Sequence, residues 1–413
     1  MSAATMPVMR SLRDAPLRFP ARSLRGIARS PIAGVAGARL DNNTKNVSKP
    51  GEVTSRDRRH ALRFVLSRES KLNRVASCGR RRIRVEPVPL WKREAGDAYL
   101  SNVQMCGSVH SCPVCAAKIR QRRAVEIDRV VKAHMDAGGS ALFQTFTLPH
   151  DFGDSLSSLL KTVAGAFRKV ISGSRYLDDK RVYSITASIR ASETTFGKAG
   201  AHPHLHVIFF CDRPLSNAEA RALNARLFAR WVVAVEAVGY RAPLIGLCPI
   251  ERVTTSSLGA YVQKFVMTAD SNQKLGMEMT RHDLKVGRRE GRTPFQVLAD
   301  FAATGDCADL ALWHEWEKGS KGMQSVTWSK GLKARYGIVE KTDEELAAEE
   351  VGGELIAELS VDQWNLVKAE PLGTLRVLQI AEREGADGVF RWLLEADLRR
   401  QRRLADCVKS GNT

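Results

Sequence analysis

The 413-residue sequence predicts an α+β fold built on a largely antiparallel β-sheet with flanking helices. Residues 181–196 alternate polar and apolar side chains and are rich in β-branched residues, as strands are. The turn sequence GKAGA at 197–201 then leads into the apolar returning strand HPHLHVIFF at 202–210. Helical periodicity on both sides of this hairpin predicts the order β-α-β-β-α-β-α for residues 141–268.

The other elements of this domain follow from the same two periodicities. We expect, in chain order, a buried strand at 141–149 that Pro149 ends, a helix at 155–171, a helix at 216–238, a short strand near 244–253 and a helix at about 256–268. The second helix begins at a capping box, Ser216-x-x-Glu219, in which each residue satisfies a backbone N–H of the other.

The sheet domain is one of five expected segments. These are a disordered basic arm (1–60), a cysteine-rich zinc segment with a helix (61–138), the sheet domain (139–270), a basic extension (271–335) and a C-terminal module (336–413). Within them we expect helices at 60–75, 119–136 and 296–335, the last interrupted by a strand near 323–328, and a separate, mainly helical or winged-helix module at the C-terminus.

The charge of the chain favours nucleic acid as a partner. There are 64 Lys and Arg against 45 Asp and Glu, which gives a net charge of +19. No run of 18 apolar residues is present, so we expect no membrane span and a cytoplasmic protein. The first 50 residues lack the apolar core of a secretory signal, and a basic arm or an organelle transit peptide both fit their composition.

Three alternating histidines predict a metal site on the sheet. Since successive side chains of a strand point to opposite faces, His202, His204 and His206 share one face. Two imidazoles on neighbouring positions can hold one divalent ion, Mg²⁺ or Mn²⁺, if a carboxylate completes the site. Glu193 on the preceding strand is the candidate, provided that the register places it beside His206. The alternative is a polar face of a half-exposed strand.

Four cysteines in residues 78–115 predict a structural zinc site. The spacing Cys106-x5-Cys112-x2-Cys115 contains a Cys-Pro-x-Cys turn, which directs two thiolates to one point. Cys78 or His110 would supply the fourth ligand, and the alternative is a set of buried free thiols. Basic residues that surround the cluster are candidates for phosphate contacts: Arg80, Arg81, Arg82, Lys118, Arg120, Arg122 and Arg123.

The expected helix SLGAYVQKFVM (257–267) carries a tyrosine and a lysine three residues apart. A phenol is a competent nucleophile if a base removes its proton or a cation stabilises its anion. Tyr261 is therefore a candidate nucleophile, with Lys264 as the stabilising cation or as a phosphate contact. Taken alone, Tyr261 would be read as a packing residue.

Three of these segments, taken in order, are similar to the motifs of a known family. FTLPHD (146–151), HPHLHV (202–207) and YVQKF (261–265) resemble the three motifs of rolling-circle plasmid replication initiators (Rep). These belong to the HUH endonuclease superfamily and are here of the single-tyrosine type. GRTPFQVL (291–298) and VTWSKGLK (326–333) also look like bacterial members, so the resemblance covers roughly residues 76–335.

The resemblance implies an RRM-like or ferredoxin-like sheet with the histidine strand in its centre and the tyrosine helix packed beside it. It implies a divalent metal on His204 and His206, and Tyr261 attacking a DNA phosphate to leave a 5′-phosphotyrosine and a free 3′-OH. It also favours Cys78 as the fourth zinc ligand. The implied partners are the plasmid double-strand origin, presented as a hairpin or single-stranded nick region, and the host helicase and polymerase.

Some members carry a water-activating carboxylate one helical turn before the tyrosine, where this chain has Ser257. Glu251 and Asp270 are two possible substitutes, between which the sequence does not choose. Two other functions also stay open. One is a related HUH enzyme, a transposase or relaxase. The other is a non-enzymatic, zinc-containing DNA-binding regulator.

Overall fold

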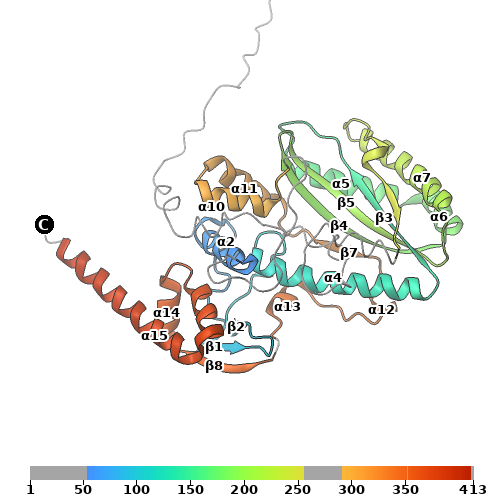
Figure 1. The fold of residues 1–413 in the computed structure, drawn as a ribbon. Coiled ribbons are helices and arrows are strands. Elements are labelled where there is room, and N and C mark those ends of the chain that lie inside the picture. The colour runs from blue at the N-terminus through green and yellow to red at the C-terminus, as the bar shows by residue number, and fades with distance from the viewer. Residues whose placement is uncertain (1–53, 255–290, 351, 411–413) are drawn as a thin grey trace, which may run out of the picture.

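The computed structural model describes residues 54–254, 291–350 and 352–410. Its centre is a five-stranded sheet in the order β6-β3-β5-β4-β7, in which every neighbouring pair is antiparallel (Figure 1). The strands are β3 (Ser140–Thr147), β4 (Ile185–Gly197), β5 (Gly200–Cys211), β6 (Ile250–Arg252) and β7 (Val326–Trp328). The predicted α+β class is confirmed, and the histidine strand β5 is the central strand.

The β4–β5 hairpin is the longest pairing in the sheet. Its register runs from Ile185 opposite Cys211 to Gly197 opposite Gly200. Gly200 closes the turn with φ +93°, a backbone conformation that residues with a Cβ rarely adopt. The glycine therefore fixes which residues of the two strands face each other.

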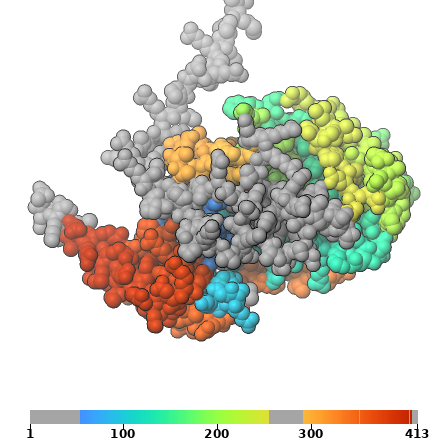
Figure 2. Space-filling model, in the orientation of Figure 1, coloured from blue at the N-terminus to red at the C-terminus, as the bar shows by residue number. Residues whose placement is uncertain are grey.

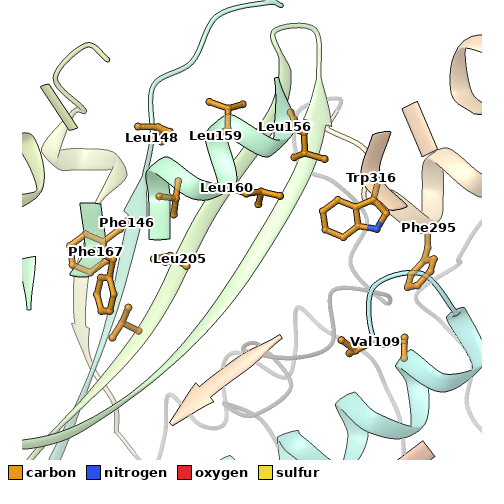
Figure 3. Close-up of a cluster of buried hydrophobic side chains, with 14 of the residues drawn as sticks. Val109, Phe146, Leu148, Leu156, Leu159, Leu160, Phe167, Leu205, Phe295 and Trp316 are labelled. Atoms are coloured by element: carbon orange, nitrogen blue, oxygen red, sulfur yellow. The ribbon is translucent and has the colours of Figure 1, made fainter. Parts of the chain in front are cut away.

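One face of the sheet is covered by helices α5 (Leu156–Val170) and α7 (Asn217–Glu236). Figure 3 shows Phe146 of β3 and Leu205 of β5 beside Phe167 of α5, and all three are buried. The expected capping box at the start of α7 is confirmed, because Ser216 and Glu219 each accept the other's backbone N–H. Between α5 and β4 lies a short helix that the sequence did not predict, α6 (Gly173–Val182).

Helix α4 (Pro113–Asp136) covers part of the opposite face. Ile127, Val130 and Val131 are fully buried there against strand residues such as Phe143 and Ala191. Each such side chain contributes up to about 1.5–3 kcal/mol to folding. His206 lies at the border of this contact, where its ring stacks on Phe143.

The cysteine segment shares its core with the α5–α7 face of the sheet. Helices α2 (Ser55–Glu69), α3 (Asn73–Ala76), α10 (Pro294–Thr304) and α11 (Cys307–Gly319) surround it. All four clustered cysteines fall in the same set of contacting buried side chains as Phe146 and Phe167. In Figure 3, Trp316 and Phe295 lie beside Val109 of the cysteine loop.

The C-terminal region is mainly helical, as expected, but it is not built from residues 336–413 alone. It comprises α12 (Leu332–Arg335), α13 (Asp343–Ala348), β8 (Glu354–Leu359), α14 (Val361–Ala369) and α15 (Gly373–Ser410), whose helical geometry is interrupted at Gly385. Strand β8 pairs with β1 (Val88–Lys92), which pairs with β2 (Ala98–Leu100). Figure 2 shows the surface of β1 and β2 adjoining the C-terminal helices.

Several boundaries differ from expectation. Helix α2 begins five residues earlier than the expected helix at 60–75, because Thr54 caps it together with Asp57. The strand expected near 244–253 is a 3-10 turn, Ile245–Leu247, followed by the short β6. The expected helix at 256–268 lies outside the described residues. Within the described part of the chain, no helix combines the length and apolarity that crossing a membrane requires.

Candidate functional site

Three side chains from the β4–β5 hairpin meet on one face of the sheet. Glu193 Oε2 lies 3.1 Å from His206 Nε2 and 3.3 Å from His204 Nε2. Glu193 and His206 are buried, and His204 is nearly so. The register pairs Glu193 directly with His204, whereas the expected register placed it beside His206. His206 is instead a diagonal neighbour, close enough for a long side chain to reach.

The hydrogen bonding of the His204 ring is compatible with a cation beside Glu193. Its Nδ1 lies 3.4 Å from the carbonyl oxygen of His202, which can only accept. With the proton on Nδ1, the lone pair of Nε2 faces the Glu193 carboxylate at 3.3 Å and both atoms can bind one metal ion; with the proton on Nε2, the ring donates to Glu193 instead.

The three donor atoms fit one divalent ion. They lie within 4.8 Å of one another, and two ligands at right angles with bonds of about 2.1 Å are separated by about 3.0 Å. His206 is further held by Thr145 Oγ1, 3.2 Å from its Nδ1, and by the stacked ring of Phe143. Such support of the second ring nitrogen is common for metal-binding histidines. No local pattern predicts Thr145 as a site residue, although its place opposite His206 follows once the register is known.

His202 lies on the same face but outside this group of ligands. Its Nδ1 is 3.0 Å from His150 Nε2, and His150 Nδ1 is 3.1 Å from the Ala199 carbonyl. Burial, with the nearby histidines, lowers the pKa of His202 to about 4, so the ring is neutral at pH 7. His150 belongs to the segment FTLPHD, and its meeting with His202 depends on a long-range strand pairing that local pattern does not show.

Tyr261 and Lys264 lie outside the described residues, as do Ser257 and Asp270. Glu251 is described and lies on the edge strand β6, opposite Phe143. Since directly paired residues share a face, Glu251 is on the same side of the sheet as His206. It lies two residues further along the strands than His206.

The four cysteines also converge. Cys78, Cys106, Cys112 and Cys115 are all buried, and their sulfur atoms lie within 4.8 Å of one another. Three of the sulfur–sulfur separations are 3.6, 3.6 and 3.7 Å. A regular tetrahedron with zinc–sulfur bonds of 2.3 Å has edges of about 3.8 Å.

The four thiols shift one another's pKa values. The thiols of Cys106, Cys112 and Cys115, and then the Arg63 guanidinium, lower the pKa of Cys78, whereas the neighbouring thiols and burial raise the pKa values of the other three. Arg63 is buried, and it lies so close over Gly79 that a Cβ there would overlap its guanidinium. His110, the other candidate fourth ligand, instead packs its ring against Trp316 and is not in the group. The residues therefore fit a structural Zn²⁺ held by four cysteines.

The basic residues near the cysteines differ in their surroundings. Arg120 and Arg123 are buried, and they donate to Val109 O and to Asp343 and Lys341 O, respectively. Other donors of the set also contact the protein: Arg80 binds Lys368 O, Arg82 binds Glu86 O, Lys118 binds Ala347 O, and Arg122 pairs with Glu349. Arg81 is exposed. A DNA-binding role for these residues stays a prediction.

Comparison with known proteins gives two relatives. The chain is 26% identical to a protein named Protein rep from Streptomyces lividans over 359 residues, which covers 71% of this chain and 77% of the relative. It is 33% identical to a Neomycin resistance protein from Streptomyces cyanogenus over 139 residues, 28% of this chain and 32% of the relative. No family model matches the chain, and no solved structure matches it. Over most of its length, then, this chain is similar to Protein rep of Streptomyces lividans.

Proposed function

We propose that this protein initiates rolling-circle replication of a plasmid by nicking one DNA strand at the origin. The observation that carries the proposal is the convergence of Glu193, His204 and His206 on the central strand pair. The similarity to Protein rep supports a role in replication, and the net charge of +19 supports DNA as the substrate.

The nick would be a transesterification that needs no high-energy cofactor. The phenolic oxygen of Tyr261 forms a bond to the scissile phosphorus, and the bond from phosphorus to the 3′ oxygen breaks. The 3′ oxygen takes up the proton that the phenol has lost. The products are a 5′-phosphotyrosine and a 3′-OH, which host polymerase extends after helicase unwinding. Lys264 would stabilise the phenolate or contact the phosphate.

Glu193, His204 and His206 would hold a Mg²⁺ or Mn²⁺ ion, which when bound polarises the scissile phosphate and neutralises developing charge. The chain's own contribution is to fix these ligands: Thr145 orients His206, and the carbonyl of His202 orients His204. The later strand closure is the reverse exchange, in which a new 3′-OH attacks the phosphotyrosine.

The test is a nicking assay on supercoiled plasmids that carry candidate origins, with Mn²⁺ and with metal removed. We expect a nicked circle with protein covalently attached to its 5′ end. Tyr261→Phe should abolish the adduct but keep DNA binding, and His204→Ala should abolish cleavage, whereas Tyr240→Phe serves as the control. DNA binding without any nicking would instead favour the non-enzymatic regulator. Nicking that does not support replication in a host would favour a transposase or relaxase.

A further inference from the structure

A groove of about 1290 Å³ separates the cysteine loop from the edge of the sheet. One wall consists of residues 71–75 and the cysteine loop 106–111. The other consists of residues 320–324 and 326–328, the latter being edge strand β7, and continues through Lys333 to residues 340–345. The groove is therefore shaped jointly by the cysteine cluster and by the sheet that carries the histidines.

The groove begins close to the candidate metal centre. Val326, which lines it, is paired with Ala191, and Ala191 is paired with His206. Since directly paired residues point to the same face, all three lie on the histidine side of the sheet. Neighbouring strands are about 4.8 Å apart, so the backbone at Val326 is about 10 Å from that at His206.

The charges of the groove favour an anionic strand. Four of its cations, Lys71, Arg74, Lys321 and Lys333, form no ion pair within the described part of the chain, and they come from both walls. The acidic residues of the groove are Glu340, Asp343, Glu344 and Glu345, four against the six lysines and arginines that line it. The Asp343 carboxylate pairs with Arg123 at 3.0 Å, and the lining as a whole keeps a net charge of +2, six cations minus four acids.

Trp328 positions one of these cations. The Lys333 ammonium lies 5.4 Å from the centroid of the Trp328 ring, within the range of a cation–π contact. Trp328 itself is anchored on β7, where it pairs with Ile189 of β4. The ammonium of Lys333 is therefore held at the side of the groove that adjoins the sheet.

We propose that this groove holds the single strand of DNA that flanks the scissile phosphate, with Lys333 and Arg74 on opposite walls contacting its phosphates. The inference rests on the proposed function and deepens it, since it names where the strand next to the nick would lie. The cysteine cluster would then contribute to DNA binding as well as to stability, because the loop that it holds forms a wall of the groove.

The test uses a 5′-fluorescein-labelled 16-nucleotide oligothymidylate and the full chain, with fluorescence anisotropy measured at several salt concentrations and without added Mg²⁺ or Mn²⁺. Each phosphate contact to a single strand contributes about −0.7 to the slope of log affinity against log salt. We expect Lys333→Ala and Arg74→Ala each to reduce the slope by about 0.7 and to weaken binding about fivefold at 0.1 M salt. The matched control is Lys161→Ala, an exposed lysine on α5, on the other side of the sheet.

Trp328→Ala should weaken binding about as much as Lys333→Ala, and the double variant should be no weaker than either single variant. Equal affinities for Lys333→Ala, Arg74→Ala and Lys161→Ala would overturn the groove assignment, even if the protein nicks DNA. The proposed function fails by a different result, namely an undiminished covalent adduct in Tyr261→Phe or His204→Ala. Urea unfolding of each variant establishes that the loss of binding is not a loss of folding.

Discussion

Replacing Thr145 by valine tests whether the histidine pair is built to bind metal. Valine keeps the size and β-branching of threonine but removes Oγ1, which lies 3.2 Å from His206 Nδ1. One hydrogen bond contributes about 0.5–1.5 kcal/mol, which corresponds to about 2- to 12-fold in affinity. Loss of a partner that orients a metal-binding histidine costs about 10- to 100-fold. Because this bond is long and Phe143 still stacks on the ring, we expect about tenfold weaker Mn²⁺ binding.

The affinity is measured by titrating Mn²⁺ and following the free ion by electron paramagnetic resonance. Thr194→Val is the matched control, since Thr194 is buried next to Glu193 and its hydroxyl has no hydrogen-bond partner in the described part of the chain. That variant should bind Mn²⁺ like the unmodified protein. If Thr145→Val binds as tightly as Thr194→Val, the hydroxyl does not orient a metal ligand and the reasoning is refuted.

Three further predictions concern stability. Cys112→Ser should lose bound zinc, measured by atomic absorption, and unfold at lower denaturant concentration, because structural zinc contributes about 10 kcal/mol or more; the exposed Cys307→Ser should retain zinc. Asp179→Ala should cost about 1–3 kcal/mol in urea unfolding, because it leaves the largely buried Arg230 without its carboxylate partner, while the half-exposed Arg226 is hydrated by solvent. Arg181→Ala, in an exposed pair, should cost no more than about 1 kcal/mol. The third follows from the pKa of His202, which burial lowers to about 4 from 6.5. The unfolded chain therefore binds a proton between these pH values that the native ring does not, and native stability should fall by up to about 3 kcal/mol as the pH drops from 6.5 to 4. In His202→Gln this part of the pH dependence should disappear. If the stability of this variant depends on pH as that of the unmodified protein does, His202 is not the group responsible.

The hairpin and its ligands were predictable because their signals are local. Alternation placed His204 and His206 on one face, and the short turn ending at Gly200 brought Glu193 onto the adjacent strand. The exact register was not predictable, because a shift of partner along the strands changes no local pattern. Glu193 therefore reaches its expected partner His206 across a diagonal, while it faces His204 directly.

Other features escaped prediction for a different physical reason. Helix α6 buries only Asp179, so it carries no apolar period and is held by ion pairs with α7. The convergence of Cys78 with the other three cysteines was inferred from family resemblance, since no local spacing links residue 78 to residue 106. Strand β8 pairs with β1, which is more than 250 residues away in the chain, and the sequence of neither strand predicts which strand it will pair with.

The pairing of β8 with β1 has a consequence for synthesis. Strand β1 leaves the ribosome early, but the strand that completes its sheet is made only after residue 353. Until then one edge of β1 offers unpaired backbone groups, which invite association with other nascent chains. A premature stop before β8 would make that exposure permanent, so truncated products should precipitate even though the central sheet has all of its own strands.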